Sequence, residues 1–297
     1  MRVCPVCAAS IDKSVLFLPE RIRPEKITDA SFSSRKIPEF MNYRLVRCRS
    51  CDVVYTSDPL SKQALERLYH QAAYDSAEEA EDAARSYAEA LAPFFAHLSN
   101  KEDALEIGTG TGAFLEKLRE FGFEHLVGVE PSAAAIDAAP EHRRLWIREG
   151  MFDVNEFEPE SFDLICCFMT MEHVREPQGL AREVRSLLRH GGAFVTVTHD
   201  YRSPINRLLG RFSPIIDVEH MQIFSTVGIR TLFELSGFLI NSVARLRNEY
   251  SITYWLRLMP IPRVAKASIE WALRLLRLNN LRIKIDVGNV LTIGTKL

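Results

Sequence analysis

The sequence predicts an α/β fold built on a doubly wound parallel sheet, with a cysteine-rich module before the sheet and a helical insertion near the C-terminus. Between residues 103 and 200, short apolar runs alternate with segments of helical period. Continuous apolar strands of this kind are typical of parallel sheets that helices cover on both faces. Two cysteine pairs precede this region and a basic stretch precedes the last apolar run. The sheet is therefore expected to be Rossmann-like, with ligands at the carboxyl ends of its strands.

The 297 residues carry a net charge of −2 that is distributed unevenly. Residues 58–240 hold 17 Lys and Arg against 30 Asp and Glu, whereas residues 241–297 hold 10 against 3. The overall field gives no reason to expect nucleic acid as a partner. No apolar run is long enough to span a bilayer, and the start MRVCPVCAAS lacks the apolar core of a secretory signal. A cytoplasmic location is expected, where cysteines are thiols or metal ligands.

Two C-x-x-C pairs, Cys4 with Cys7 and Cys48 with Cys51, have the ligand spacing of a structural zinc site with four thiolates. The gap of 40 residues between the pairs requires one loop to bulge or to form its own hairpin. A redox pair or a coincidence of spacing is the alternative. Residues 1–57 are therefore expected to form a zinc-ribbon module, and residues 58–100 a helical linker or lid.

Residues 101–297 are expected to form the main domain, with insertions at about 200–220 and 250–285. The segments that read as strands and helices follow one another in chain order. Strands are expected at 104–107, 125–130, 144–149, 162–169, 191–199, 238–246 and 289–296, and helices at 112–121, 132–139 and 178–189. Cys166 and Cys167 fall in a continuously apolar strand and are expected to be core residues.

A glycine-rich loop follows the first strand of the main domain and opens a helix. Glycines there allow a sharp turn and close approach of the backbone to a ligand, while the helix start offers unpaired N–H groups. Gly108, Gly110 and Ala113 also satisfy the dinucleotide pattern G-x-G-x-x-A. Glu106, two positions before the first glycine, disfavours a pyrophosphate and suits a cationic group. Glu130 ends the next strand, where a carboxylate accepts hydrogen bonds from ribose hydroxyls.

The ordered segments EIGTGTGAF, GVEPS, FDLICCFMTMEHVREP and LLRHGGAFVTVT resemble the motifs of class I S-adenosylmethionine-dependent methyltransferases over residues 103–200. The later segment EHMQIFSTVGIRTLFELSGF resembles small-molecule enzymes of the ubiquinone-biosynthesis O-methyltransferase type. The resemblance implies a seven-stranded sheet and S-adenosylmethionine as cofactor. It implies a binding set of Glu106, Gly108, Thr109, Gly110, Gly112, Glu130, Pro131, Met151, Phe152 and Phe168. Members often carry Asp where Met151 stands, so Asp153 is an alternative partner for the adenine.

Three histidines follow strands or lie in connections near the expected crevice: His173, His199 and His220. Each is a candidate general base for methyl transfer to a hydroxyl group, and each has a purely structural alternative. A divalent ion held by Glu172, His173 and Glu219 is a further alternative. Oxygen is the favoured acceptor atom because of these histidines, and the D/N-P-P-Y/F pattern associated with methylation of planar amines is absent from the sequence.

Residues 263–278 form a basic, partly amphipathic segment within the second insertion. Such a helix can lie on a membrane surface, or it can act as a lid over the active-site mouth or as a dimer contact. The expected function is transfer of a methyl group from S-adenosylmethionine to a small metabolite. A zinc-ribbon RNA methyltransferase, for which Arg44, Arg47 and Arg49 would supply basic contacts, is the first alternative. A non-catalytic S-adenosylmethionine-binding protein is the second.

Overall fold

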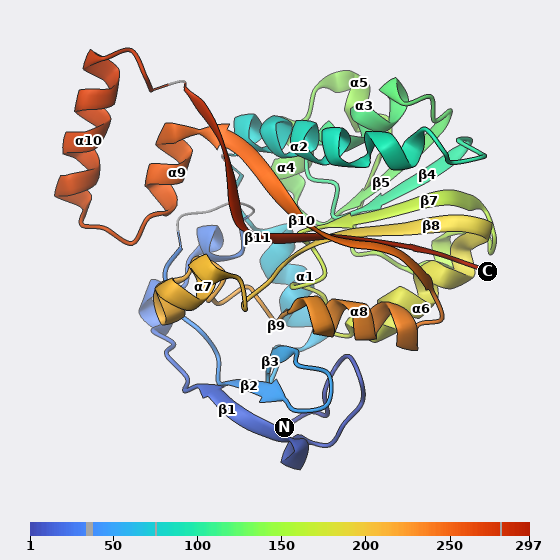
Figure 1. Ribbon diagram of the computed structural model, residues 1–297, viewed down its shortest axis with the longest axis horizontal. Coiled ribbons are helices and arrows are strands. Elements are labelled where there is room, and N and C mark those ends of the chain that lie inside the picture. The colour runs from blue at the N-terminus through green and yellow to red at the C-terminus, as the bar shows by residue number, and fades with distance from the viewer. Residues whose placement is uncertain (34–37, 75, 280) are drawn as a thin grey trace.

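The computed structural model describes residues 1–33, 38–74, 76–279 and 281–297 (Figure 1). Its centre is a seven-stranded sheet in the order β10-β11-β8-β7-β4-β5-β6. Five strands are parallel, and β11 and β10 continue the sheet antiparallel at one edge. This confirms the predicted fold class. The bounds are β4 Asp103–Ile107, β5 His125–Glu130, β6 Ile147–Glu149, β7 Phe162–Phe168, β8 Leu188–His199, β10 Leu239–Ser251 and β11 Arg282–Thr295.

Helices cover both faces of this sheet (Figure 1). On one face lie α2 Ala77–Phe95, α3 Ala113–Glu120, α4 Ala133–Ala138 and α5 Glu141–Arg144, and on the other lie α6 Pro177–Leu187 and α8 Thr226–Leu235. Every residue of β7 is buried, because the strand lies in the middle of the sheet between two apolar layers. The third predicted strand is shorter than expected, since Arg144 ends α5 and β6 begins only at Ile147.

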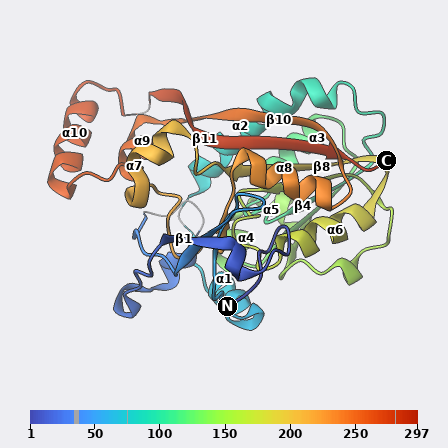
Figure 2. The same cartoon turned by 60° about the horizontal axis from the view of Figure 1, so that its bottom comes forward.

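The N-terminal module contributes β1 Ser14–Leu18, β2 Leu45–Cys48 and β3 Val54–Thr56. A two-residue strand from the main domain, β9 Gln222–Ile223, pairs antiparallel with β3 and completes a second sheet in the order β1-β2-β3-β9. Val6, Val53 and Tyr55 belong to the same apolar cluster as Phe233 of α8. The module therefore packs against the helices below the large sheet, as Figure 2 shows from beneath.

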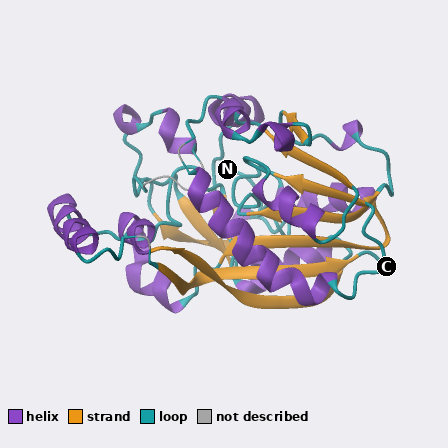
Figure 3. Ribbon diagram, turned by 90° about the horizontal axis from the view of Figure 1, so that it is seen from above, coloured by secondary structure: helices purple, strands orange, loops and turns teal. Residues whose placement is uncertain are grey.

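The second insertion is a long antiparallel hairpin with two helices at its tip. β10 and β11 run further than predicted, and their pairing continues from Leu239 with Thr295 to Ser251 with Arg282. The tip carries α9 Ile252–Leu258 and α10 Arg263–Leu275, and Figure 3 shows it projecting from the body. Shorter elements are α1 Lys62–His70 and α7 Pro204–Leu209, with 3-10 turns at Ile11–Lys13, Pro24–Lys26, Asp29–Phe32, Val154–Glu156 and Gly210–Phe212. Among the described residues, no helix has the length and apolarity needed to cross a bilayer.

Candidate active site

A cavity of about 530 Å³ opens at the carboxyl ends of β4, β5, β7 and β8. This is where ligands bind in open α/β sheets. The structure brings together in its wall every predicted cofactor-binding residue except Gly112, together with all three candidate histidines. Residues of α1 and α2 close another side of the cavity, namely Leu65, Tyr69, Ala80, Ala84 and Tyr87.

The glycine loop has a backbone that other residues would strain. Gly108 has φ +76°, and a Cβ built on it would lie 2.3 Å from Thr170 Oγ1. Gly110 has φ +57° and no atom within 4 Å of its Cβ position, so its backbone borders open space in the cavity. Gly112 lies outside the cavity wall, and its Cβ position faces Arg143 and Ile147. Its role is therefore to turn the chain, with φ +70°, into α3.

Two buried carboxylates flank the glycine loop. Glu106 is 4% exposed, and Thr109 Oγ1 donates a hydrogen bond of 2.5 Å to its Oε2. Glu130 Oε2 accepts from the Gly110 amide at 2.7 Å, and Oε1 accepts from the Ser132 amide at 2.9 Å. Burial raises the pKa of Glu130, and the two amide hydrogen bonds oppose that shift. A carboxylate oxygen has two lone pairs, so Glu130 can accept from ligand hydroxyls in addition to these two amides.

At the far end of the loop, Met151 and Phe152 line the cavity beside Pro131. Phe152 stacks on Phe157 with ring centroids 6.0 Å apart. Asp153 is exposed and accepts a hydrogen bond from the Asn155 amide at 3.0 Å, and it does not line the cavity. The structure therefore does not support Asp153 as the partner of an adenine. Met151 and Phe152 line this part of the cavity instead.

The three candidate histidines form one cluster although they lie far apart in the sequence. The rings of His173 and His220 have centroids 4.8 Å apart, and those of His199 and His220 lie 5.7 Å apart. His220 Nδ1 lies 2.9 Å from the Ile215 carbonyl oxygen. His173 Nδ1 lies 3.0 Å from the Tyr69 hydroxyl, which donates to the Glu219 carbonyl oxygen at 3.2 Å. Carbonyl oxygens only accept, so the His220 ring donates from Nδ1.

Glu172 and His199 are coupled at the base of this cluster. Glu172 is fully buried, and its Oε1 accepts a hydrogen bond of 2.6 Å from the His199 amide. Burial raises the pKa of Glu172 to about 8 and lowers the pKa of the His199 imidazole to about 4. Burial thus favours the neutral form of both groups.

The ion site proposed for Glu172, His173 and Glu219 is not formed. Among the described residues, the carboxylate groups close enough to share an ion are Glu39 with Asp217 and Glu219, and Glu102 with Asp103 and Asp163. Asp217 accepts from the amides of Glu39 and Met41, so its oxygens already stabilise a loop. Glu172 instead accepts a hydrogen bond from the backbone of β8, and its carboxylate is not part of either of these carboxylate clusters.

Several lining residues gave no signal in the sequence. Tyr250 comes from β10, and Tyr254, Trp255 and Leu258 from the adjoining α9, while Asn289 comes from β11. They lie in the insertion or beyond it, where aromatic residues in a sequence pattern are indistinguishable from core residues. None of the lining residues belongs to 263–278, so α10 does not cover the cavity, and residues of α9 line it instead.

The N-terminal module contacts the loops that carry the histidines. Gln222, at the start of β9, is fully buried, and its Nε2 donates to the carbonyl oxygens of Met171 and Val174 on either side of His173. Arg2 donates to the carbonyl oxygens of Arg175 at 2.6 Å and Met221 at 3.0 Å. The Gln222 hydrogen bonds join the His220 loop to the His173 loop, and those of Arg2 join the N-terminal module to both loops.

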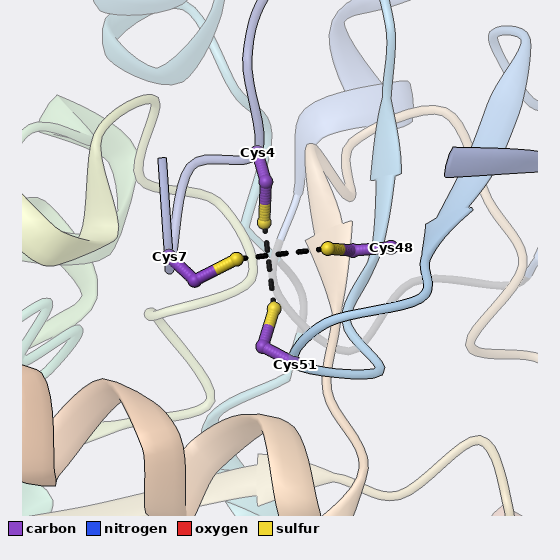
Figure 4. Close-up of side chains that lie close together, drawn as sticks. All are labelled: Cys4, Cys7, Cys48 and Cys51. Atoms are coloured by element: carbon purple, nitrogen blue, oxygen red, sulfur yellow. Dashed lines mark hydrogen bonds between the residues drawn. The ribbon is translucent and has the colours of Figure 1, made fainter. Parts of the chain in front are cut away.

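The four cysteine side chains converge on one point (Figure 4). The Sγ atoms of Cys4 and Cys51 lie 3.4 Å apart, those of Cys7 and Cys48 lie 3.6 Å apart, and all four lie within 4.8 Å of one another. A tetrahedral zinc ion with bonds of about 2.3 Å requires sulfurs about 3.8 Å apart, so the residues fit the metal.

The two cysteine turns share one geometry. Ala8 and Asp52, each directly after the second cysteine of its pair, have positive φ angles of 56° and 63°. The amide of each donates to the carbonyl oxygen of the first cysteine of its pair, at 3.0 Å for Cys4 and 3.1 Å for Cys48. This tight turn aims both thiols of a pair toward the common point.

A glycine loop with a flanking carboxylate, an acidic residue at the end of the second strand and an antiparallel edge of this order define a class I S-adenosylmethionine-dependent methyltransferase. Residues 79–243 match the family model described as a methyltransferase domain. The chain belongs to this family, and S-adenosylmethionine is its methyl donor.

Known proteins agree with this assignment. The chain is 29% identical over 126 residues to a ubiquinone biosynthesis O-methyltransferase from Paraburkholderia xenovorans, covering 39% of this chain and 52% of that one. A protein of the same name from Coxiella burnetii is 28% identical over 113 residues, covering 36% and 48%. The chain thus spans about half the length of the curated relatives it matches.

Two solved structures share the fold. The YcgJ protein from Bacillus subtilis aligns with a TM-score of 0.50 at 18% identity, covering 70% of this chain and 98% of that one. A candidate methyltransferase from Bacillus halodurans C-125 aligns with a TM-score of 0.51 at 15% identity, covering 71% and 99%. At these identities the likeness concerns the fold alone.

Proposed function

We propose that this chain transfers a methyl group from S-adenosylmethionine to an oxygen atom of a small-molecule acceptor. The observation that carries the proposal is a single cavity whose wall holds the glycine loop, Glu106 and Glu130 together with three clustered histidines. Donor-binding residues and candidate bases thus face one enclosed space, as direct transfer of a methyl group between a bound donor and a bound acceptor requires.

In this proposal each donor residue has a role that its surroundings support. Glu106 faces the cationic methionine end, and the open backbone at Gly110 allows close approach of the donor. Glu130 accepts from the ribose hydroxyls, while Met151 and Phe152 flank the adenine. The bound donor supplies an electrophilic methyl group on a sulfonium that leaves as a neutral thioether.

The acceptor side favours an apolar, hydroxyl-bearing molecule. Tyr250, Tyr254, Trp255 and Leu258 form one stretch of the cavity wall. Flat aromatic side chains of this kind suit an aromatic ring. The matched relatives are named for O-methylation in ubiquinone biosynthesis, which agrees with a phenolic acceptor.

The four-cysteine cluster is proposed to bind one structural zinc ion. With four thiolates the coordination shell is closed, so the metal has no open position for a substrate. The proposed division is a zinc-ribbon module at 1–57, a helical linker at 58–100 that covers the cavity, and the catalytic domain at 101–297.

The free face of α10 is proposed to touch an anionic membrane surface. Val264, Trp271 and Leu275 are 79%, 68% and 67% exposed and lie on one side of the helix. Residues 263–278 hold four cationic residues, Arg263, Lys266, Arg274 and Arg277, against one acidic residue, Glu270. An exposed apolar stripe with a basic border is typical of helices that lie in a membrane interface.

The experiment is calorimetric titration with S-adenosylmethionine, followed by transfer of labelled methyl from the donor to 3,4-dihydroxybenzoate as a phenolic probe. We expect donor binding in the wild type and its loss in Glu106→Ala, with Glu124→Ala, an exposed glutamate outside the cavity, as the matched control. Failure of the wild type to bind the donor contradicts the proposal. Donor binding without transfer to phenols or to other hydroxyl compounds supports a non-catalytic binding protein instead.

A further inference from the structure

The side chain of His199 is held by an asparagine from the neighbouring strand. His199 ends β8, and it is paired directly with Asn289 of β11. Its Nδ1 lies 3.0 Å from Asn289 Oδ1. Asn289 is 3% exposed, so this contact is shielded from water.

A second asparagine fixes the orientation of the first. Asn289 Nδ2 donates a hydrogen bond of 2.6 Å to Asn248 Oδ1 on β10, and Asn248 is fully buried. With its amide nitrogen used in this way, Asn289 presents its oxygen to His199. That oxygen only accepts, so the proton must be on His199 Nδ1 and the lone pair on Nε2.

The other ring nitrogen is available to a ligand. His199 lines the cavity, and its Nε2 has no hydrogen-bond partner among the residues that the structure describes. The groups around the ring are neutral or distant from it: Glu172 contacts the backbone amide, His220 lies edge-on at 5.7 Å, and Asn289 carries no charge.

We infer that His199 is the general base of the proposed methyl transfer, and that Asn289 and Asn248 are positioning residues that set its tautomer. This inference rests on the proposed function. The acceptor hydroxyl passes its proton to Nε2 as the oxygen–methyl bond forms, and the sulfur–methyl bond breaks with its electron pair left on sulfur. The Nδ1 hydrogen bond to Asn289 partly offsets the burial that disfavours the imidazolium so formed.

The arrangement distinguishes His199 from the two other histidines. His173 contacts the Tyr69 hydroxyl of α1 and the Glu219 carbonyl oxygen of the His220 loop, and His220 contacts the Ile215 carbonyl oxygen of its own loop. His199 is held by Asn289 and, through it, by Asn248, on adjacent strands of the central sheet. Groups on rigid strands are placed more accurately than groups on loops.

Nitrogen-15 spectra of the histidine rings in the full-length protein test the tautomer without any acceptor. We expect the wild type to show the Nδ1–H form of His199 throughout pH 5 to 8. Asn289→Leu should lose this preference, and Asn289→Asp, which keeps an acceptor and adds charge, should retain it and protonate at higher pH. Asn241→Leu, an exposed position on β10, is the matched control and should leave the signal unchanged.

Transfer to 3,4-dihydroxybenzoate supplies the second readout. His199→Gln should lower kcat by about 100-fold or more, the usual contribution of a general base, with the affinity for S-adenosylmethionine unchanged. Asn289→Leu should lower kcat by about tenfold, and Asn289→Asp should shift the acid limb of the rate profile upward. An Nε2–H tautomer in the wild type, or full activity of His199→Gln, overturns the inference. Absence of donor binding in the wild type overturns the proposed function instead.

Discussion

The amide of Gly110 donates a 2.7 Å hydrogen bond to Glu130, so the carboxylate at the end of β5 holds the glycine loop that follows β4. Glu130 therefore holds the glycine loop in place, in addition to lining the donor cavity itself. Its second oxygen holds the Ser132 amide at the start of α4.

Replacing Glu130 with Gln should weaken S-adenosylmethionine binding by about 10- to 100-fold, or about 1.4–2.8 kcal/mol. The amide has one acceptor oxygen in place of two, so it cannot hold both backbone amides and also accept from the ribose. Calorimetric titration measures the change. Glu120→Gln, an exposed residue at the end of α3, serves as the control. An unchanged dissociation constant would contradict the role of Glu130.

The buried carboxyl of Glu172 should make stability depend on pH. Its pKa is raised from 4.5 to about 8, so the folded protein holds a proton that the unfolded chain releases. This contribution is fully present below pH 4.5 and is lost as the pH rises through 8. Glu172→Gln stays neutral and should be more stable than the wild type by a few kcal/mol at pH 9, with little difference at pH 4.

Urea unfolding of both proteins at a series of pH values measures this difference. The glutamine keeps an oxygen that accepts from the His199 amide, so the local hydrogen bond is preserved. A stability gap that does not change between pH 4 and pH 9 would show that Glu172 is charged in the folded state.

Removing the Gln222 amide should loosen the acceptor side of the site and leave the donor side intact. Gln222→Ala leaves two buried carbonyl oxygens without this donor, at a cost of about 1–3 kcal/mol each. We expect faster amide exchange at 171–174 and a kcat lower by at least tenfold, with donor affinity within threefold of the wild type. Gln63→Ala, exposed on α1, is the control. Equal losses in donor binding and turnover would indicate a general loss of structure.

Purified protein should contain one zinc ion per chain, bound by four sulfurs at about 2.3 Å. Cys48→Ser should lose the metal and lower the melting temperature, because binding of structural zinc contributes directly to folding. Metal analysis and X-ray absorption check the count and the ligands. Cys166→Ala, in the buried strand β7, should be destabilised without losing zinc. A metal-free wild type would contradict the proposed site.

The double variant Trp271→Glu with Leu275→Glu should bind vesicles of mixed neutral and anionic phospholipid at least tenfold more weakly than the wild type. Charges at these positions oppose insertion of the apolar face into the interface. Cosedimentation measures the bound fraction, and Leu145→Glu, 84% exposed and distant in sequence, is the control. A dimer that the double variant disrupts, without vesicle binding by the wild type, would assign this face to a second copy of the chain.

Features that short stretches of sequence specify were predictable. The order of strands and helices follows from the spacing of apolar residues, and the strained turns of the glycine loop follow from Gly108 and Gly110. The two thiols of each cysteine pair are brought together by a local turn of the same geometry. In the glycine loop and in each cysteine turn, the determining residues lie within a few positions of one another, so local backbone geometry fixes their arrangement.

The arrangement of residues on the acceptor side of the cavity depends on contacts between segments that lie far apart in the chain. His173 and His220 from two loops meet His199 from the end of β8 in one cluster, and Asn289 reaches His199 because β11 inserts antiparallel beside β8. Pairing between strands that lie far apart in the chain leaves no periodic pattern in the sequence, because it depends on tertiary packing and not on neighbouring residues. The sequence by itself determined the donor half of the site and the cysteine ligands. The tertiary structure decided which histidine has a neighbour that fixes its tautomer, and which side of the cavity is proposed to bind the acceptor.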